Sequence, residues 1–171
     1  MKAELFSSDF LISFFIFLSA FIIMVSYYQN IQTDVYETSM RNDMISKDIS
    51  IASLLATTSG QPRYWNFNST DAQYVQVIGL YDSGKFNLTK FEYLKTDNCT
   101  NARSMLGTGA YNLYIILKNT TGGVLQKSDG YSYFCGNPAT NEEQTVIVKR
   151  LGVVDIEGNI TKVTMEVILW V

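Results

Sequence analysis

The most constraining feature of this chain is an uncharged apolar stretch near its N-terminus. Residues 10–28 read FLISFFIFLSAFIIMVSYY, interrupted only by three serines. As a helix rising about 1.5 Å per residue, the stretch spans about 28 Å, close to the roughly 30 Å of a bilayer core. A surface helix of a globular protein has a polar stripe, and this one has none. Because exposing large apolar side chains costs about 1.5–3 kcal/mol each, the segment must lie in lipid or among similar helices.

A cleaved secretory signal is the alternative interpretation, since the apolar stretch is N-terminal and follows Lys2. Two features oppose it. The run exceeds the about 7–15 residues of a signal core, and Ser26-Tyr27-Tyr28-Gln29 contains no small-x-small cleavage site. We therefore expect the segment to be retained as a membrane-inserted helix.

One continuous helix is predicted from about residue 8 to residue 58, because neither glycine nor proline occurs before Gly60. Its second half, residues 30–58, is amphipathic and can pack onto the following domain, onto neighbouring subunits, or onto both at different heights. Glycine and proline in Ser59-Gly60-Gln61-Pro62 then end the helix. The apolar positions of this half are Ile31, Val35, Met40, Met44, Ile45, Ile49, Ala52 and Leu55. Charged residues expected on other faces are Asp34, Glu37, Arg41, Asp43, Lys47 and Asp48.

The pattern changes from helix to strand after Pro62, so the chain divides into a helix at 1–60 and a head domain at 61–171. Short segments rich in Val, Ile, Tyr, Phe and Thr predict six or seven strands. The predicted class is α+β, with an antiparallel β-sandwich-like head; an open barrel fits the same number of short strands. Gly158-Asn159 is expected to form a two-residue hairpin turn. The predicted strands are 74–81, 85–94, 111–118, 130–135, 145–155 and 160–171.

Two cysteines, Cys99 and Cys135, both belong to the head. In a chain with an export-type segment they predict one disulfide, which the chain-entropy model values at roughly 3–4 kcal/mol. Two buried free thiols are the alternative.

Asparagine sequons are the clearest chemical signal in the head. Asn-x-Thr occurs five times, always after residue 60 and always in or beside predicted turns and strand ends. This clustering predicts N-linked glycans and an extracellular head, whereas an Asn/Thr-rich polar β surface is the plainer interpretation. The five candidate asparagines are Asn68, Asn87, Asn98, Asn119 and Asn159.

Composition excludes several function classes. Histidine is absent, which removes Ser-His-Asp and Cys-His catalysis and histidine-based metal sites. A net charge of −3, with scattered basic residues, provides no footprint for nucleic acid. We expect no enzyme, no metal site, no nucleic-acid partner and no cofactor other than glycans.

Two weaker candidates have plain structural interpretations. Glu142-Glu143 is more typical of a solvated acidic turn than of a cation site. Aromatic side chains could form a sugar-stacking platform but are more typical of core and edge packing; they are Tyr64, Trp65, Tyr131, Tyr133 and Phe134.

The whole arrangement resembles an archaeal type IV pilin or archaellin-like filament subunit. A short basic start at Met1-Lys2-Ala3 precedes the long apolar helix, and a β-rich head with sequons and cysteines follows. The resemblance implies a lollipop architecture and a homo-oligomeric, helical filament that serves adhesion or motility, with membrane insertion before assembly. It also implies polar contacts near the helix start through Lys2, Glu4 or Asp9. The residues expected in the helical core of the filament are Phe10, Phe14, Phe17, Leu18, Phe21, Ile22 and Val25.

A membrane-anchored surface glycoprotein with a non-polymerising binding head is the alternative function. The helix extension at 30–58 distinguishes the two, because a simple anchor needs no second half. A surface hydrolase is disfavoured by the missing histidine and the missing nucleophile motif.

Overall fold

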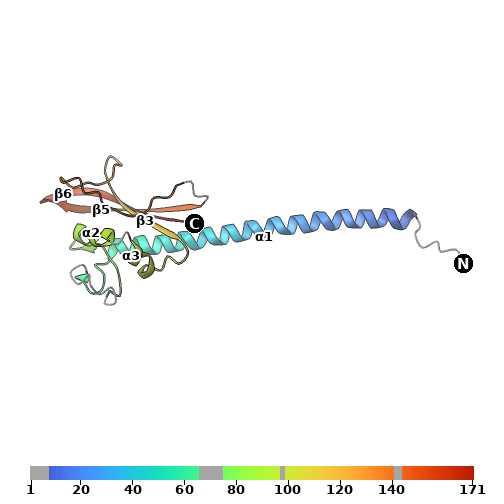
Figure 1. Ribbon diagram of the computed structural model, residues 1–171, viewed down its shortest axis with the longest axis horizontal. Coiled ribbons are helices and arrows are strands. Elements are labelled where there is room, and N and C mark those ends of the chain that lie inside the picture. Colours follow the sequence, from blue (N-terminus) through green and yellow to red (C-terminus); the bar gives the residue numbers. More distant parts are fainter. Residues whose placement is uncertain (1–7, 66–74, 97–98, 141–143) are drawn as a thin grey trace. The chain divides into compact units, whose positions relative to one another are not determined.

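The computed structural model describes residues 8–65, 75–96, 99–140 and 144–171 (Figure 1). It is an α+β structure that divides into two compact units, Met1–Met40 and Arg41–Val171. Helix α1 (Ser8–Thr57) contributes to both units. The predicted helix is confirmed to within one residue at its C-terminus, where Gly60 adopts a φ of +84°.

The second unit contains a six-stranded sheet. Its strands are β1 (Tyr81–Asp82), β2 (Lys85–Phe86), β3 (Asn112–Asn119), β4 (Phe134–Gly136), β5 (Thr145–Ile156) and β6 (Asn159–Trp170). They lie in the order β1-β2-β5-β6-β3-β4. Its centre is the long hairpin of β5 and β6, to which β3 adds antiparallel, from Asn112↔Trp170 to Asn119↔Val163. At the opposite side, β2 pairs parallel to β5 at Phe86↔Val154.

The predicted antiparallel sandwich is therefore wrong: the sheet is mixed, and helices rather than a second sheet cover it. Figure 1 shows the C-terminal part of α1, α2 (Leu88–Thr96) and α3 (Thr100–Met105) on one side of the sheet. The segment of α1 after Met40 buries an apolar stripe there, while Arg150 of β5 donates a hydrogen bond to Ser53 Oγ at 2.7 Å. From α2, the Phe91 ring packs edge-on against buried Tyr133. The buried apolar residues of α1 are Met44, Ile51, Ala52 and Leu55.

Three of the predicted strands are much shorter than expected. The strand predicted at 85–94 ends at Phe86, because Asn87 Oδ1 accepts the Lys90 N–H at 3.2 Å and so caps the first turn of α2. Among the described residues of the segment predicted at 74–81, only Tyr81 enters a named strand, and of 130–135 only the part from Phe134 does so. In the first of these segments the pattern misassigned a helix as a strand, because short apolar runs fit both. In the other two, isolated bridges at Val77 and Ser132 stand in place of the longer strands expected.

The turn of the β5–β6 hairpin lies one residue earlier than predicted, at Glu157-Gly158. Both residues have positive φ, 54° and 87°, as a type I′ turn requires. The Asp155 carboxylate accepts the Gly158 N–H at 3.0 Å, and this contact holds the turn in place. Asn159 consequently begins β6 and is exposed.

Candidate functional site: the apolar helix and the sequon-bearing head

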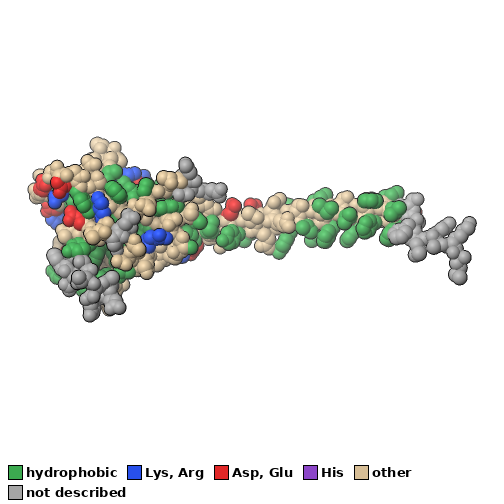
Figure 2. All heavy atoms as spheres, viewed as in Figure 1, with side chains coloured by type: hydrophobic (Ala, Val, Ile, Leu, Met, Phe, Trp, Pro, Cys, Tyr) green, Lys and Arg blue, Asp and Glu red, His purple; other side chains and the backbone are tan. Residues whose placement is uncertain are grey.

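The apolar part of α1 is exposed along its whole described length within the first unit. The residues expected in a filament core are between 38% (Leu18) and 66% (Phe17) exposed. Figure 2 shows hydrophobic side chains gathered along the visible face of this segment. By length and composition, α1 is able to cross a membrane, which suits either an anchor or a signal sequence.

The polar groups of this segment do not interrupt its apolar surface. Ser19 Oγ donates to the carbonyl oxygen of Phe15 at 2.7 Å, so its hydroxyl is satisfied within the helix. Asp9 lies in the first turn, where a negative charge interacts favourably with the helix dipole. Lys2 and Glu4, the other predicted polar contacts, lie outside the described residues.

The two cysteines form the predicted disulfide. Cys99 and Cys135 are joined with their Cα atoms 5.4 Å apart, and both are buried. The bond ties the residue preceding α3 to strand β4, across a separation of 36 residues. It therefore links a helical segment of the head to the edge of the sheet.

Three of the five sequon asparagines lie in described parts of the head, and Asn68 and Asn98 lie outside them. Asn119 Oδ1 accepts three hydrogen bonds, from the N–H and Oγ1 of Thr121 and from the Gly123 N–H, at 2.7–3.1 Å. Asn159 is exposed at the hairpin. In Asn87 and Asn119 the amide oxygen is engaged, whereas the amide nitrogen, the atom that carries an N-linked glycan, has no hydrogen bond to the described residues.

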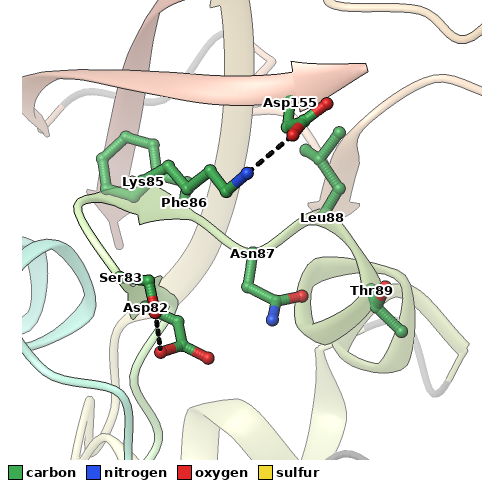
Figure 3. A pocket seen from close by; sticks show the side chains of 8 residues that line it. All are labelled: Asp82, Ser83, Lys85, Phe86, Asn87, Leu88, Thr89 and Asp155. Carbon is green, nitrogen blue, oxygen red and sulfur yellow. Dashed lines mark hydrogen bonds and ion pairs between the residues drawn. The ribbon is translucent and has the colours of Figure 1, made fainter. Parts of the chain in front are cut away.

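Asn87 also lines a hollow of about 240 Å³ beside strand β2 (Figure 3). Two ion pairs border it: Lys85 Nζ lies 2.6 Å from Asp155 Oδ2, and Arg63 Nη2 lies 2.6 Å from Asp82 Oδ1. The hydrogen bond from Lys85 holds the pKa of Asp155 below its ordinary value, and that from Arg63 does the same for Asp82. Both carboxyls therefore stay ionised at neutral pH and act as hydrogen-bond acceptors.

Asp48 is a buried acid whose position the sequence pattern misassigned. It lies on the buried stripe of α1, four residues after Met44, rather than on a polar face. Its side chain is 0% exposed, and neither carboxylate oxygen has a hydrogen-bond partner among the described residues. Burial raises its pKa to about 7, although the nearby backbone amide of Val148 favours the charged form. Spacing from Met44 and Leu55 was the signal that could have placed it on this face.

Two further buried charged residues, Lys90 and Glu166, have partners, and no local sequence pattern marks either of them as buried. Lys90 of α2 donates to the Ser59 carbonyl oxygen at 2.5 Å, just past the end of α1, and burial lowers its pKa. On the face of the sheet opposite α1, Glu166 binds Lys118 at 2.7 Å and Lys149 at 2.9 Å. These contacts pair each buried charge within the head.

The described aromatic residues do not form one sugar-binding platform. Trp65 and Tyr133 are buried, Tyr131 and Phe134 are half-buried, and Tyr64 is exposed. The Glu142-Glu143 pair lies outside the described residues. Within the described parts of the chain, no group of three or more acidic or cysteine side chains could hold a metal ion.

Comparison of the chain with protein-family models, with curated proteins and with solved structures found no match. What this protein does is therefore inferred from its own residues: an exposed apolar helix, and a disulfide-linked head whose described sequon asparagines are half-buried (Asn87, Asn119) or exposed (Asn159).

Proposed function

We propose that this protein is the structural subunit of an extracellular filament of the type IV pilus kind. In this proposal, residues 10–28 of α1 first reside in the membrane and then pack against the same segment of other copies. The β head forms the outer layer, carries N-linked glycans and serves adhesion or motility. The protein performs no catalysis.

The observation that supports a filament over a simple anchor is the exposure of α1 beyond its apolar run. The run that a membrane would hold ends at Tyr28. Further along, Ile31, Val35 and Tyr36 are 42%, 61% and 68% exposed. Apolar side chains that lie outside the bilayer and outside a core need a partner surface, and a bundle of neighbouring subunits provides one.

The physical basis of assembly is the exchange of lipid contacts for protein contacts. A helix satisfies its own backbone hydrogen bonds, so residues 10–28 can move from a bilayer into a helical bundle without exposing unpaired backbone groups. The stacked pairs Phe10–Phe14 and Phe17–Phe21 form ridges that neighbouring helices can pack against. A head-to-tail interface that does not close on itself then propagates as a fibre.

A single-pass surface glycoprotein with a non-polymerising head is the second candidate. Residues 10–28 alone are long enough to span a bilayer, and this observation favours it. The partner of its head would be a surface or host-cell molecule.

Negative-stain microscopy of the purified full-length protein distinguishes the two functions. We expect filaments from the unaltered protein and from Phe17→Leu, which keeps the surface apolar. Phe17→Asp should abolish filaments, because burying an unpaired carboxylate in the bundle costs several kcal/mol. The head of that variant should remain folded, as judged by circular dichroism and an intact disulfide. Detergent-dependent monomers without filaments in the unaltered protein would support the anchor instead.

A further inference from the structure

We propose that the hollow beside Asn87 is the seat of a covalently attached sugar: a glycan on Asn87 Nδ2 packs its first residue against the head. This inference rests on the proposed glycosylated exterior and adds which asparagine holds its glycan in a fixed orientation.

The side chain of Asn87 is already oriented for this role. Its Oδ1 caps α2 by accepting the Lys90 N–H, and glycosylation replaces a hydrogen on Nδ2 without using Oδ1. The cap and the glycan are therefore compatible. In Figure 3 the amide oxygen of Asn87 lies toward α2, and the amide nitrogen points away from that helix.

The hollow offers the kinds of groups that bind sugar hydroxyls. Asp82 Oδ1 is engaged by Arg63 and Ser83, whereas Oδ2 has no hydrogen bond to any described residue. Lys85 and Asp155 form an ion pair at the rim that can both donate and accept. Leu88 adds an apolar surface for the ring carbons, and Thr89 completes the sequon from α2. At about 240 Å³, the volume suits one sugar ring rather than a longer oligosaccharide.

The attachment is a group transfer from an activated donor of the glycosyl phosphate class, catalysed by a separate transferase. A bond forms between the anomeric carbon of the sugar and Asn87 Nδ2. The bond between that carbon and the phosphate oxygen breaks, and the phosphate leaves with the electron pair. Nδ2 loses one proton to a base of the transferase, so atoms and charge balance.

Asn159 provides the internal comparison. It is exposed, as are its chain neighbours Gly158 and Ile160, so a glycan there extends into solvent without a seat. Removing the glycan from Asn87 should therefore change the head locally, and removing it from Asn159 should not.

The test uses full-length protein from a glycosylating source and from a host that lacks the transferase. Peptide mass spectrometry measures occupancy, and native hydrogen exchange measures protection of the amides of residues 81–86. Thr89→Ala and Asn87→Asp each abolish the sequon, and Asp keeps the capping oxygen. Thr89→Ser retains the sequon, and Thr161→Ala removes only the one at Asn159.

In the unaltered protein we expect a glycan at Asn87. In Thr89→Ala and Asn87→Asp we expect at least a tenfold loss of hydrogen-exchange protection at residues 81–86. Thr89→Ser and Thr161→Ala should match the unaltered protein. Made without the transferase, all of these proteins should show equal protection, which separates the glycan from the substitution itself.

Equal protection with and without an Asn87 glycan overturns the seat. Glycans at other sequons with Asn87 unmodified also overturn it, while leaving the proposed glycosylated exterior intact. Unmodified asparagine at all five sequons overturns the glycosylated exterior as well.

Discussion

The two parts of helix α1 belong to one continuous element but follow opposite rules. Every described side chain from residue 9 to residue 39 is exposed, although residues 10–28 are almost entirely apolar. After Met40, Met44, Ile51, Ala52 and Leu55 are buried against the head, on a segment that carries several charges. Hydrophobicity thus does not indicate which part of the helix packs against the head of its own chain. The more polar part is buried within its own chain, and the apolar part needs lipid or other chains.

The strongest test of this difference makes the same substitution, Leu→Ala, in each of the two parts of α1. Leu55→Ala removes a fully buried side chain and should reduce the free energy of unfolding of the head by about 2–5 kcal/mol. Leu18→Ala, in the exposed half, should leave that free energy unchanged and lower filament yield instead. Thermal or denaturant unfolding of detergent-solubilised protein measures the first effect, and microscopy measures the second.

A loss of stability in Leu18→Ala as large as that in Leu55→Ala would contradict the view that only the part of α1 after Met40 is buried in its own chain. It would show that the apolar half packs against the head of its own chain.

The buried part of α1 also contains a buried acid, Asp48, and its effect on the stability of the head should depend on pH. Its folded pKa of about 7 lies above its ordinary value of 3.8, so the folded state keeps a proton that the unfolded state loses. Stability should therefore fall as pH rises from about 4 to about 7 and then level off. The loss amounts to at most about 4 kcal/mol, from about three pKa units at 1.36 kcal/mol each.

Asp48→Leu should remove this dependence and stabilise the head at pH 8, while having little effect at pH 4. Unfolding titrations at both pH values measure the difference. The matched control is Asp43→Leu, because Asp43 lies on the same helix but is exposed, and its carboxylate accepts a hydrogen bond from Tyr111 Oη at 2.8 Å. Its pKa is lowered mainly by that hydrogen bond, so Asp43→Leu should destabilise at pH 8. A gain in stability of equal size at both pH values would exclude an ionised Asp48 as the cause.

The smallest predicted effect concerns Glu166, a buried acid that is paired. Burial acts to raise its pKa, but the hydrogen bonds from Lys118 and Lys149 outweigh burial and lower it. Its contribution is therefore present above its unfolded pKa and is lost as pH falls through the folded pKa. Glu166→Gln should cost about 1 kcal/mol at pH 7 and less in acid, as measured by denaturant unfolding.

Lys149→Met is the control for Glu166→Gln, because it removes the more exposed of the two partners. It should cost less than Glu166→Gln, as expected for an exposed ion pair. An equal cost would place the stabilisation in Lys149 rather than in the buried carboxylate.

Much of the fold was predictable where one physical signal dominates. The absence of Gly and Pro before Gly60 predicted α1 to within a residue, and the β5–β6 hairpin followed from alternation around a turn. The sandwich was wrong because residues 88–96 form a helix through a side-chain cap at Asn87, which alternation does not report. The turn at Glu157-Gly158 was displaced because Asp155 holds it through a hydrogen bond.

The sequence by itself determined that a 19-residue apolar segment needs a non-aqueous partner, because its free-energy cost in water depends on composition alone. It also determined which asparagines are sequons, since the sequon is a local pattern. Only the tertiary structure decided that Asp48 is buried without a hydrogen-bond partner among the described residues and that Asn87, unlike Asn159, borders a hollow. Those properties depend on which distant residues, such as Val148 and Asp155, the fold brings close, and local patterns do not contain that information.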